Sequence, residues 1–226
     1  MVERVALTAL SEESRALSAV LRELGTEDWG RPTNCPPWDL QELVVHIGAS
    51  LGLNGPLPTA EAVGGLMSAS DYYRQPERAT SDYRQRNVEQ TQQFAARVLT
   101  ATSAVSWFEE VTLDTLTTLG GDDLNRVVSI SGKGAMRLEE WVLTRVVSVA
   151  AHGLDIALTL GRPAWTVPSA SQVMRPVFES LLQQQVPAPL DWDDLTFLAV
   201  ATGRRGLSES ERRVLGRSAA RFPLLS

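Results

Sequence analysis

Hydrophobic residues recur along this chain mostly at intervals of three and four, which is the spacing of one face of an α-helix. Together with the glycine, proline and capping residues that end each run, this pattern predicts a chain made almost wholly of helices. A run at 127–130 is interpreted as a short strand or an extended loop. The predicted helices are 3–25, a second that begins after Asp39, a short one at 59–68, and then 77–101, 104–119, 136–160, 169–185, 191–202 and 207–221.

The helix at 136–160 is apolar on nearly every side, which is typical of a helix that is buried all round. Polar residues nevertheless recur on it every three or four positions, and residues with that spacing are neighbours on a helix surface. A buried helix with one polar ridge is expected to line a site. The ridge consists of Glu140, Thr144, Ser148, His152 and Asp155.

The second helix follows a stiff loop, because residues 29–38 contain two consecutive prolines. Asp39 is placed as the N-cap, and Glu42 three positions later completes a capping box. Trp38, just before the cap, is placed for a hydrophobic staple. His46 lies on the shoulder of the apolar face and is expected to point along an edge of the core.

These elements predict an all-α fold: a four-helix bundle over 1–165 and a helical C-terminal extension over 166–226. A chain of 226 residues is long enough to bury a large core. We expect no membrane span and no secretory leader, and the single Cys35 is typical of a reducing cytoplasm. A net charge of −6 argues against nucleic acid as a partner.

His46 and His152 are the only histidines in the chain. A histidine near a core is most often structural. Both of these, however, lie on well-defined predicted helices that can face the bundle interior, where helix bundles build their metal sites. A shared site is therefore the alternative, and imidazole is a suitable ligand for zinc, nickel, iron or copper.

Three segments carry a family resemblance. The first reads Thr33-x-Cys35-Pro36-x-Trp38-Asp39-Leu40-x-x-Leu43-Val44-x-His46. The second is Ser148-x-x-x-His152-Gly153-Leu154-Asp155-Ile156, and the third is Ala201-Thr202-Gly203-Arg204-Arg205 with the terminal Phe222-Pro223-Leu224-Leu225. Together they resemble the mycothiol-dependent maleylpyruvate isomerase family of the DinB-like superfamily, whose second motif is Glu-x-x-x-His-x-x-Asp.

The resemblance implies a DinB-like four-helix bundle that holds a divalent metal, usually zinc, on two histidines and one glutamate. The histidines would be His46 and His152, with Asp155 orienting the ring of His152. It also implies a metal-activated thiol, commonly mycothiol, used for transfer or isomerisation, since a metal-bound thiol is deprotonated at neutral pH. At the position of the glutamate this chain has Ser148, whose neutral hydroxyl is a poor zinc ligand.

Other donors are poor substitutes for that glutamate. Glu140 is twelve residues from His152, about 18 Å along a helix, which is too far to share an ion. Glu42 is engaged in the cap. Cys35 is a soft ligand in the loop before His46, at a distance that the sequence leaves open.

Three functions are consistent with these residues, each with a small molecule as ligand. The first is a metal- and thiol-dependent transferase or isomerase whose site lies between His46 and His152. The second is a metal-independent acid–base enzyme, in which Asp155 orients His152 as a general base and Ser148 donates a hydrogen bond. The third is a non-catalytic ligand-binding protein.

Three residues are candidates for substrate binding. Arg204 belongs to an arginine-rich C-terminal segment and is suited to a carboxylate or phosphate, although such a segment is more often a solvated helix with ion pairs. Trp141 and Arg145 lie one turn apart on the central helix and are placed to line a pocket. The alternative for Trp141 is a position in the core.

Overall fold

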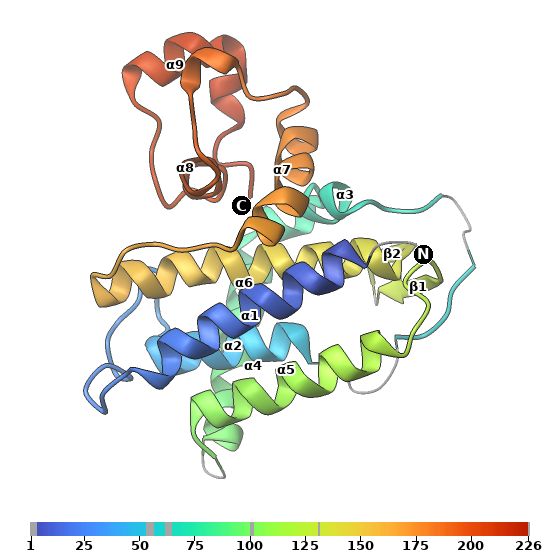
Figure 1. Cartoon of the computed structure of the whole chain (residues 1–226), viewed down its shortest axis with the longest axis vertical. Coiled ribbons are helices and arrows are strands. Elements are labelled where there is room, and N and C mark those ends of the chain that lie inside the picture. Colours follow the sequence, from blue (N-terminus) through green and yellow to red (C-terminus); the bar gives the residue numbers. More distant parts are fainter. Residues whose placement is uncertain (1–3, 53–56, 62–64, 100–101, 131, 226) are drawn as a thin grey trace.

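The computed structural model describes residues 4–52, 57–61, 65–99, 102–130 and 132–225, and it confirms the all-α class (Figure 1). In chain order its elements are α1 (Val5–Arg22), α2 (Leu40–Leu51), α3 (Ala69–Tyr73), η1 (Pro76–Ala79), α4 (Ser81–Val98), α5 (Ala104–Gly120), β1 (Val127–Ile130), β2 (Gly134–Arg137), α6 (Leu138–Leu160), α7 (Pro168–Leu182), η2 (Ala188–Leu190), α8 (Asp194–Ala201), α9 (Glu209–Leu215) and η3 (Gly216–Arg221).

Four helices form the bundle. Helix α1 packs against α5 and α6, and α2 also packs against α5 and α6. Helix α4 lies outside this group and contacts α2, so that a space lined by α2, α4, α5 and α6 is left beside the bundle core. The largest fully buried side chains include Phe108, Leu10, Leu17, Leu43 and Ile47.

Helix α6 runs through the middle of the molecule and is the buried helix that the sequence predicts (Figure 1). It ends at Gly161, whose φ of 63° is left-handed and therefore favours glycine. Its length and composition alone would also suit a membrane span, which the sequence analysis did not expect. Because 72% of its most apolar window is buried inside the protein, α6 has the character of a core helix.

The loop before α2 and its cap form as predicted. The Asp39 side chain accepts a hydrogen bond from the Glu42 backbone N–H at 2.9 Å, and Glu42 Oε2 accepts one from the Asp39 N–H at 3.3 Å. Trp38 lies against the imidazole of His46, with ring centroids 4.4 Å apart. The loop therefore positions both the helix and one face of its histidine.

The helix predicted at 59–68 is wrong. Strands β1 and β2 form an antiparallel hairpin, Thr59 bridges β1, and Met67 bridges β2, so both ends of this segment are extended. Residues 62–64 lie outside the described residues. Pairing with a hairpin some sixty to seventy positions later in the chain (Val128 and Met136) overrides the local helical pattern.

Several predicted boundaries also differ. The helix expected at 77–101 is split at Thr80, which is extended and caps α4 through its side chain; residues 100–101 lie outside the described part. The helix expected at 207–221 becomes α9 followed by the 3₁₀ helix η3. The central helix starts at Leu138, because Met136 is paired in β2.

The C-terminal extension stands on one side of the bundle (Figure 1). Its first helix, α7, packs against α1 and α6, and α8 packs against α7. The backbone N–H of Val167 and the hydroxyl of Thr166 donate to the fully buried carboxyl of Glu13 on α1, at 2.8 and 3.2 Å. This contact fixes the chain where it leaves the bundle, next to the boundary predicted at 165.

Gly48 lets α2 and α5 approach closely. A Cβ built at Gly48 would lie 2.3 Å from the ring of Trp107. We predict that Gly48→Ala lowers the free energy of unfolding by about 1–3 kcal/mol, because the ring must move away from the helix. Urea unfolding followed by tryptophan fluorescence measures this change.

Gly120→Ala is the matched control, since no atom lies within 4 Å of its Cβ position. Its free energy of unfolding should stay within about 0.5 kcal/mol of the unaltered protein. If Gly48→Ala and Gly120→Ala have the same free energy of unfolding, the close packing of Trp107 against Gly48 of α2 is contradicted.

Candidate functional site

A cavity of about 860 Å³ opens among α2, α4, α5 and α6, and residues of α3 and η1 also line it. Both histidines lie in its wall. Its lining includes His46, Ser50, Tyr72, Arg78, Thr91, Trp107, Arg145, Ser148, His152 and Arg204.

The two histidines meet in this cavity, as the sequence predicts. Their ring centroids are 5.2 Å apart, and the rings are nearly perpendicular at 89°. The Nδ1 atom of His46 lies 3.1 Å from the hydroxyl of Thr91, and Nδ1 of His152 lies 2.8 Å from Oδ2 of Asp155. Because each Nδ1 has a partner, the Nε2 atoms are left for a ligand in the cavity.

Asp155 is fully buried on α6 behind His152. It accepts hydrogen bonds from Asn34 at 2.8 Å and from the Cys35 thiol at 3.1 Å, and Arg204 binds both of its oxygens at 2.9 and 2.5 Å. Burial raises the pKa of the Asp155 carboxyl, but the hydrogen bonds from His152 and Arg204 and the Arg204 charge outweigh it and hold the pKa well below its usual range. The carboxylate is therefore charged and saturated with donors.

His46 is held in its neutral form. The pKa of its imidazole is lowered to about 3, chiefly by burial and in addition by the nearby His152, Arg145 and Arg78. At neutral pH the ring thus keeps a nitrogen lone pair.

The cavity wall also carries positive charge, from Arg78 and Arg145. Arg145 is 8% exposed, and among the described residues its hydrogen bonds all go to neutral groups, the Ser50 carbonyl, the Tyr72 hydroxyl and the Thr144 hydroxyl. Arg78 donates to the Tyr83 hydroxyl at 3.0 Å, while its buried Nε has no hydrogen-bond partner in the described part of the chain. Among the described residues neither arginine forms an ion pair with an acid. Such charges favour an anion as the ligand.

Tyr72 lies between these two arginines. The Arg145 and Arg78 guanidinium carbons are 5.7 and 4.9 Å from its ring centroid. Burial raises the pKa of its phenol, but the charges of Arg145 and Arg78 outweigh burial, and the pKa is lowered overall. This hydroxyl is therefore a better proton donor than an ordinary tyrosine.

Only part of the predicted polar ridge lines the cavity. Ser148 and His152 do, and the Ser148 hydroxyl lies 3.4 Å from that of Ser50. Glu140 instead accepts the backbone N–H of Ala69 at the start of α3, and Thr144 donates to the carbonyl of Trp141. These two residues satisfy backbone groups, so the ridge is shorter than the sequence suggested.

The candidates for substrate binding take different places. Arg145 lines the cavity. Trp141 does not line the cavity. It is 6% exposed in the core, and the Arg145 guanidinium lies 5.1 Å from its ring, so Trp141 packs against that arginine. Arg204 borders the cavity, but its side chain is bound to Asp155.

The residues at the histidine end match only part of the metal site that the resemblance implies. The imidazoles of His46 and His152 are placed as ligands, each with a partner on Nδ1. At the third position stands the neutral Ser148, Asp155 is occupied by its donors, and arginines face the same cavity. Zinc is usually bound by sulfur, nitrogen and carboxylate ligands, so this donor set does not fit a resident divalent ion.

A second group has metal-like spacing. One donor atom each from Cys35, His152 and Asp155 lie within 4.8 Å of one another. Hydrogen bonds to Asp155 account for this closeness. Burial and the neighbouring Asp155 raise the pKa of the Cys35 thiol to about 12 against the opposing effect of Arg204, so the sulfur remains protonated and a weak ligand.

Sequence reasoning missed several functional neighbours. Thr91 and Arg78 come from α4 and η1, and no motif marks either one. Asn34 and Cys35 lie inside the first motif, which was a signal that they matter, but their contact with Asp155 spans more than a hundred positions of the chain.

The fold and cavity define a helical-bundle protein with two histidines in the wall of one cavity. Comparison with protein families then identifies the chain: residues 10–157 match the Mycothiol maleylpyruvate isomerase N-terminal domain, and the chain belongs to that family. It is therefore a DinB-like, mycothiol-related enzyme domain. Comparison with curated proteins and with solved structures finds no significant match.

The depressed pKa of His46 generates a pH prediction. We expect its ring signals in NMR spectra to stay those of neutral imidazole between about pH 8 and pH 5, where an exposed histidine titrates. Because the unfolded chain takes up this proton first, the His46 contribution to stability is present above about pH 6.5 and is lost as the pH falls toward 3.

His46→Asn is the comparison variant. Its free energy of unfolding should fall less between about pH 7 and pH 4 than that of the unaltered protein, since no imidazole remains to titrate. A midpoint near the ordinary histidine pKa in the NMR titration would contradict the buried, cation-flanked environment.

Proposed function

We propose that this chain is a cytoplasmic enzyme of the thiol-dependent transferase or isomerase type, acting on a small anionic molecule between His46 and His152 without a resident metal ion. One observation carries the proposal: the wall of a cavity of about 860 Å³ holds an oriented imidazole together with two arginines, Arg78 and Arg145, that have no acidic partner among the described residues. Mycothiol, the thiol of the family name, is the proposed thiol.

His152 is the proposed general base. Its Nδ1–H is donated to Asp155, so the lone pair is on Nε2. Nε2 takes the proton of the thiol S–H, and the sulfur electron pair forms a bond to an electrophilic carbon of the substrate. The imidazolium then returns this proton to the atom on which negative charge has developed, so the base is regenerated.

Arg78 and Arg145 are the proposed anion-binding residues. A carboxylate on the substrate would accept hydrogen bonds from the unpartnered Arg78 Nε and supply the counter-charge that Arg145 lacks. Tyr72, with its lowered pKa, is placed beside them to donate a proton or a hydrogen bond. These three side chains would thus select the charge of the substrate and set its orientation.

The metal-dependent form of this function has one observation in its favour, the partners that hold Nδ1 of both histidines and leave Nε2 available. The missing carboxylate at Ser148 is the argument against it. Ser148 instead fits the role of a hydrogen-bond donor beside His152.

The first prediction from this function concerns turnover. With a thiol such as mycothiol and a panel of α,β-unsaturated carboxylic acids, we expect thiol-dependent conversion that a chelator leaves unchanged. His152→Ala should lower kcat/KM by about 10²-fold or more, because the base is lost. Thiol consumption and product formation, followed by chromatography, measure both effects.

Arg78→Gln provides the contrast, since it removes an anion-binding charge and leaves His152 and its Asp155 partner in place: KM should rise with a smaller effect on kcat. A His152→Ala variant that retains the full rate would overturn the assignment of the base. Absence of turnover with every acid in the panel would favour the non-catalytic ligand-binding alternative.

A second prediction concerns zinc. Protein purified without a histidine tag and loaded with zinc should retain less than about a tenth of an equivalent after gel filtration. Ser148→Glu should raise the retained zinc toward one equivalent, because it adds a carboxylate one turn before His152. Stoichiometric zinc in the unaltered protein, measured by elemental analysis, would establish the metal-dependent form.

A further inference from the structure

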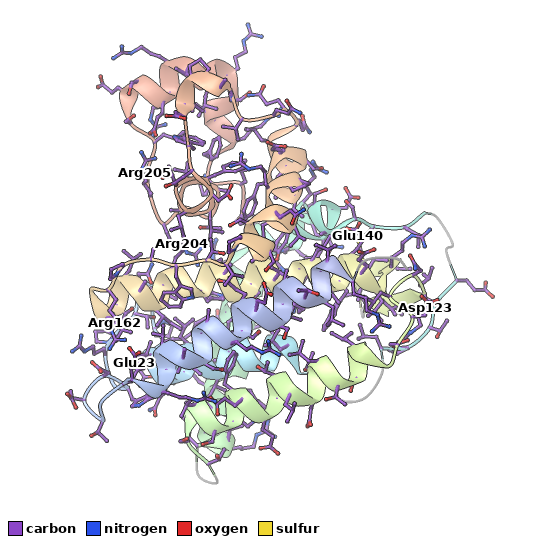
Figure 2. All side chains as sticks on the ribbon, in the orientation of Figure 1. Glu23, Asp123, Glu140, Arg162, Arg204 and Arg205 are labelled. Atoms are coloured by element: carbon purple, nitrogen blue, oxygen red, sulfur yellow. The ribbon has the colours of Figure 1, made fainter. Side chains whose placement is uncertain are left out.

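Asp155 joins three distant parts of the chain at one buried carboxylate. His152 belongs to the same helix, Asn34 and Cys35 come from the loop before α2, and Arg204 comes from the segment that follows α8. The last contact comes from outside the part of the chain that matches the family, residues 10–157. Figure 2 shows Arg204 where the extension meets α6.

Arg204 directs its donors at this carboxylate. Nε lies 2.9 Å from Oδ1 and Nη2 lies 2.5 Å from Oδ2 of Asp155, while Nη1 donates to the Thr202 carbonyl at 2.7 Å. The two parallel bonds form the planar fork that arginine makes with a carboxylate. This fork fixes the rotation of the carboxylate, and Oδ2 is also the acceptor of His152 Nδ1.

The local fold aims Arg204 at α6. Gly203 has a φ of 77°, a left-handed conformation, and the N–H groups of Arg204 and Arg205 both donate to the Ala199 carbonyl at 2.8 and 3.0 Å. Pro223 packs where a Gly203 Cβ would stand, at 3.1 Å. The chain is thus turned back toward the bundle at this residue, which gives the Gly-Arg-Arg segment a physical role.

We infer that Arg204 is a positioning residue: by clamping Asp155 it holds His152 in the tautomer with the proton on Nδ1 and the lone pair on Nε2. The inference deepens the proposed function, since this is the form that a general base needs. The C-terminal extension would then complete the site and not merely cover it. Arg204 acts through Asp155, so it need not touch the substrate.

The competing interpretation is an ion pair that only fastens the extension to the bundle. Both interpretations predict lost stability when Arg204 is replaced, so stability cannot separate them. The tautomer of His152 can, because a purely structural ion pair would leave it unchanged as long as the protein is folded. The chain has only two histidines, so their nitrogen signals are easily assigned.

The experiment uses the full chain labelled with ¹⁵N-histidine, without substrate, and records long-range ¹H–¹⁵N spectra at about pH 8.5, where imidazoles are neutral. In the unaltered protein we expect His152 to be predominantly Nδ1-protonated. In Arg204→Gln we expect a mixture of tautomers that approaches that of free histidine. Arg205→Gln is the matched control. Arg205 is paired with Glu211, so its replacement should leave the His152 signals unchanged.

A folded Arg204→Gln variant with the tautomer of the unaltered protein would overturn the inference. If that variant does not fold, Arg204→Lys keeps the charge but cannot form the fork, and it should give an intermediate tautomer ratio; an unchanged ratio there overturns the inference as well. The readout needs no turnover. A failure of the thiol chemistry would therefore leave this result standing, and the reverse also holds.

Discussion

The site depends on one buried interaction, the saturation of the Asp155 carboxylate. A fully buried anion is stable only when it is paired and hydrogen-bonded, and here the partners come from α6, from the loop before α2 and from the segment after α8. The buried charge of Asp155 therefore holds all of these partners in place. The orientation of His152 is the chemical consequence.

The distribution of charge explains the rest of the cavity. Asp155 is saturated with donors outside the cavity lining, while Arg78 and Arg145 line the cavity and have no acidic partner among the residues that the structure describes. That environment, together with burial, keeps His46 neutral and is unfavourable to a divalent cation. Ser148 is neutral and adds no counter-charge beside His152.

Much of the fold could be predicted because the signals are local. The cap of α2 at Asp39 and Glu42 and the glycine stop of α6 are set by neighbouring residues, and the bundle helices follow from their apolar spacing. The helix expected at 59–68 failed for the opposite reason. Its ends pair with β1 and β2, and backbone pairing with a distant hairpin leaves no periodic mark in the segment itself.

For the site, the sequence alone shows which groups are present: two histidines, an aspartate one turn after the second, and a serine one turn before it. It also predicts that Asp155 lies beside His152, because residues three apart on a helix are neighbours. The contacts of Thr91 with His46, of Arg204 with Asp155 and of Trp141 with Arg145 become visible only in the folded protein. Those contacts join residues on different elements or depend on how side chains pack, and a linear pattern carries no record of which surfaces meet.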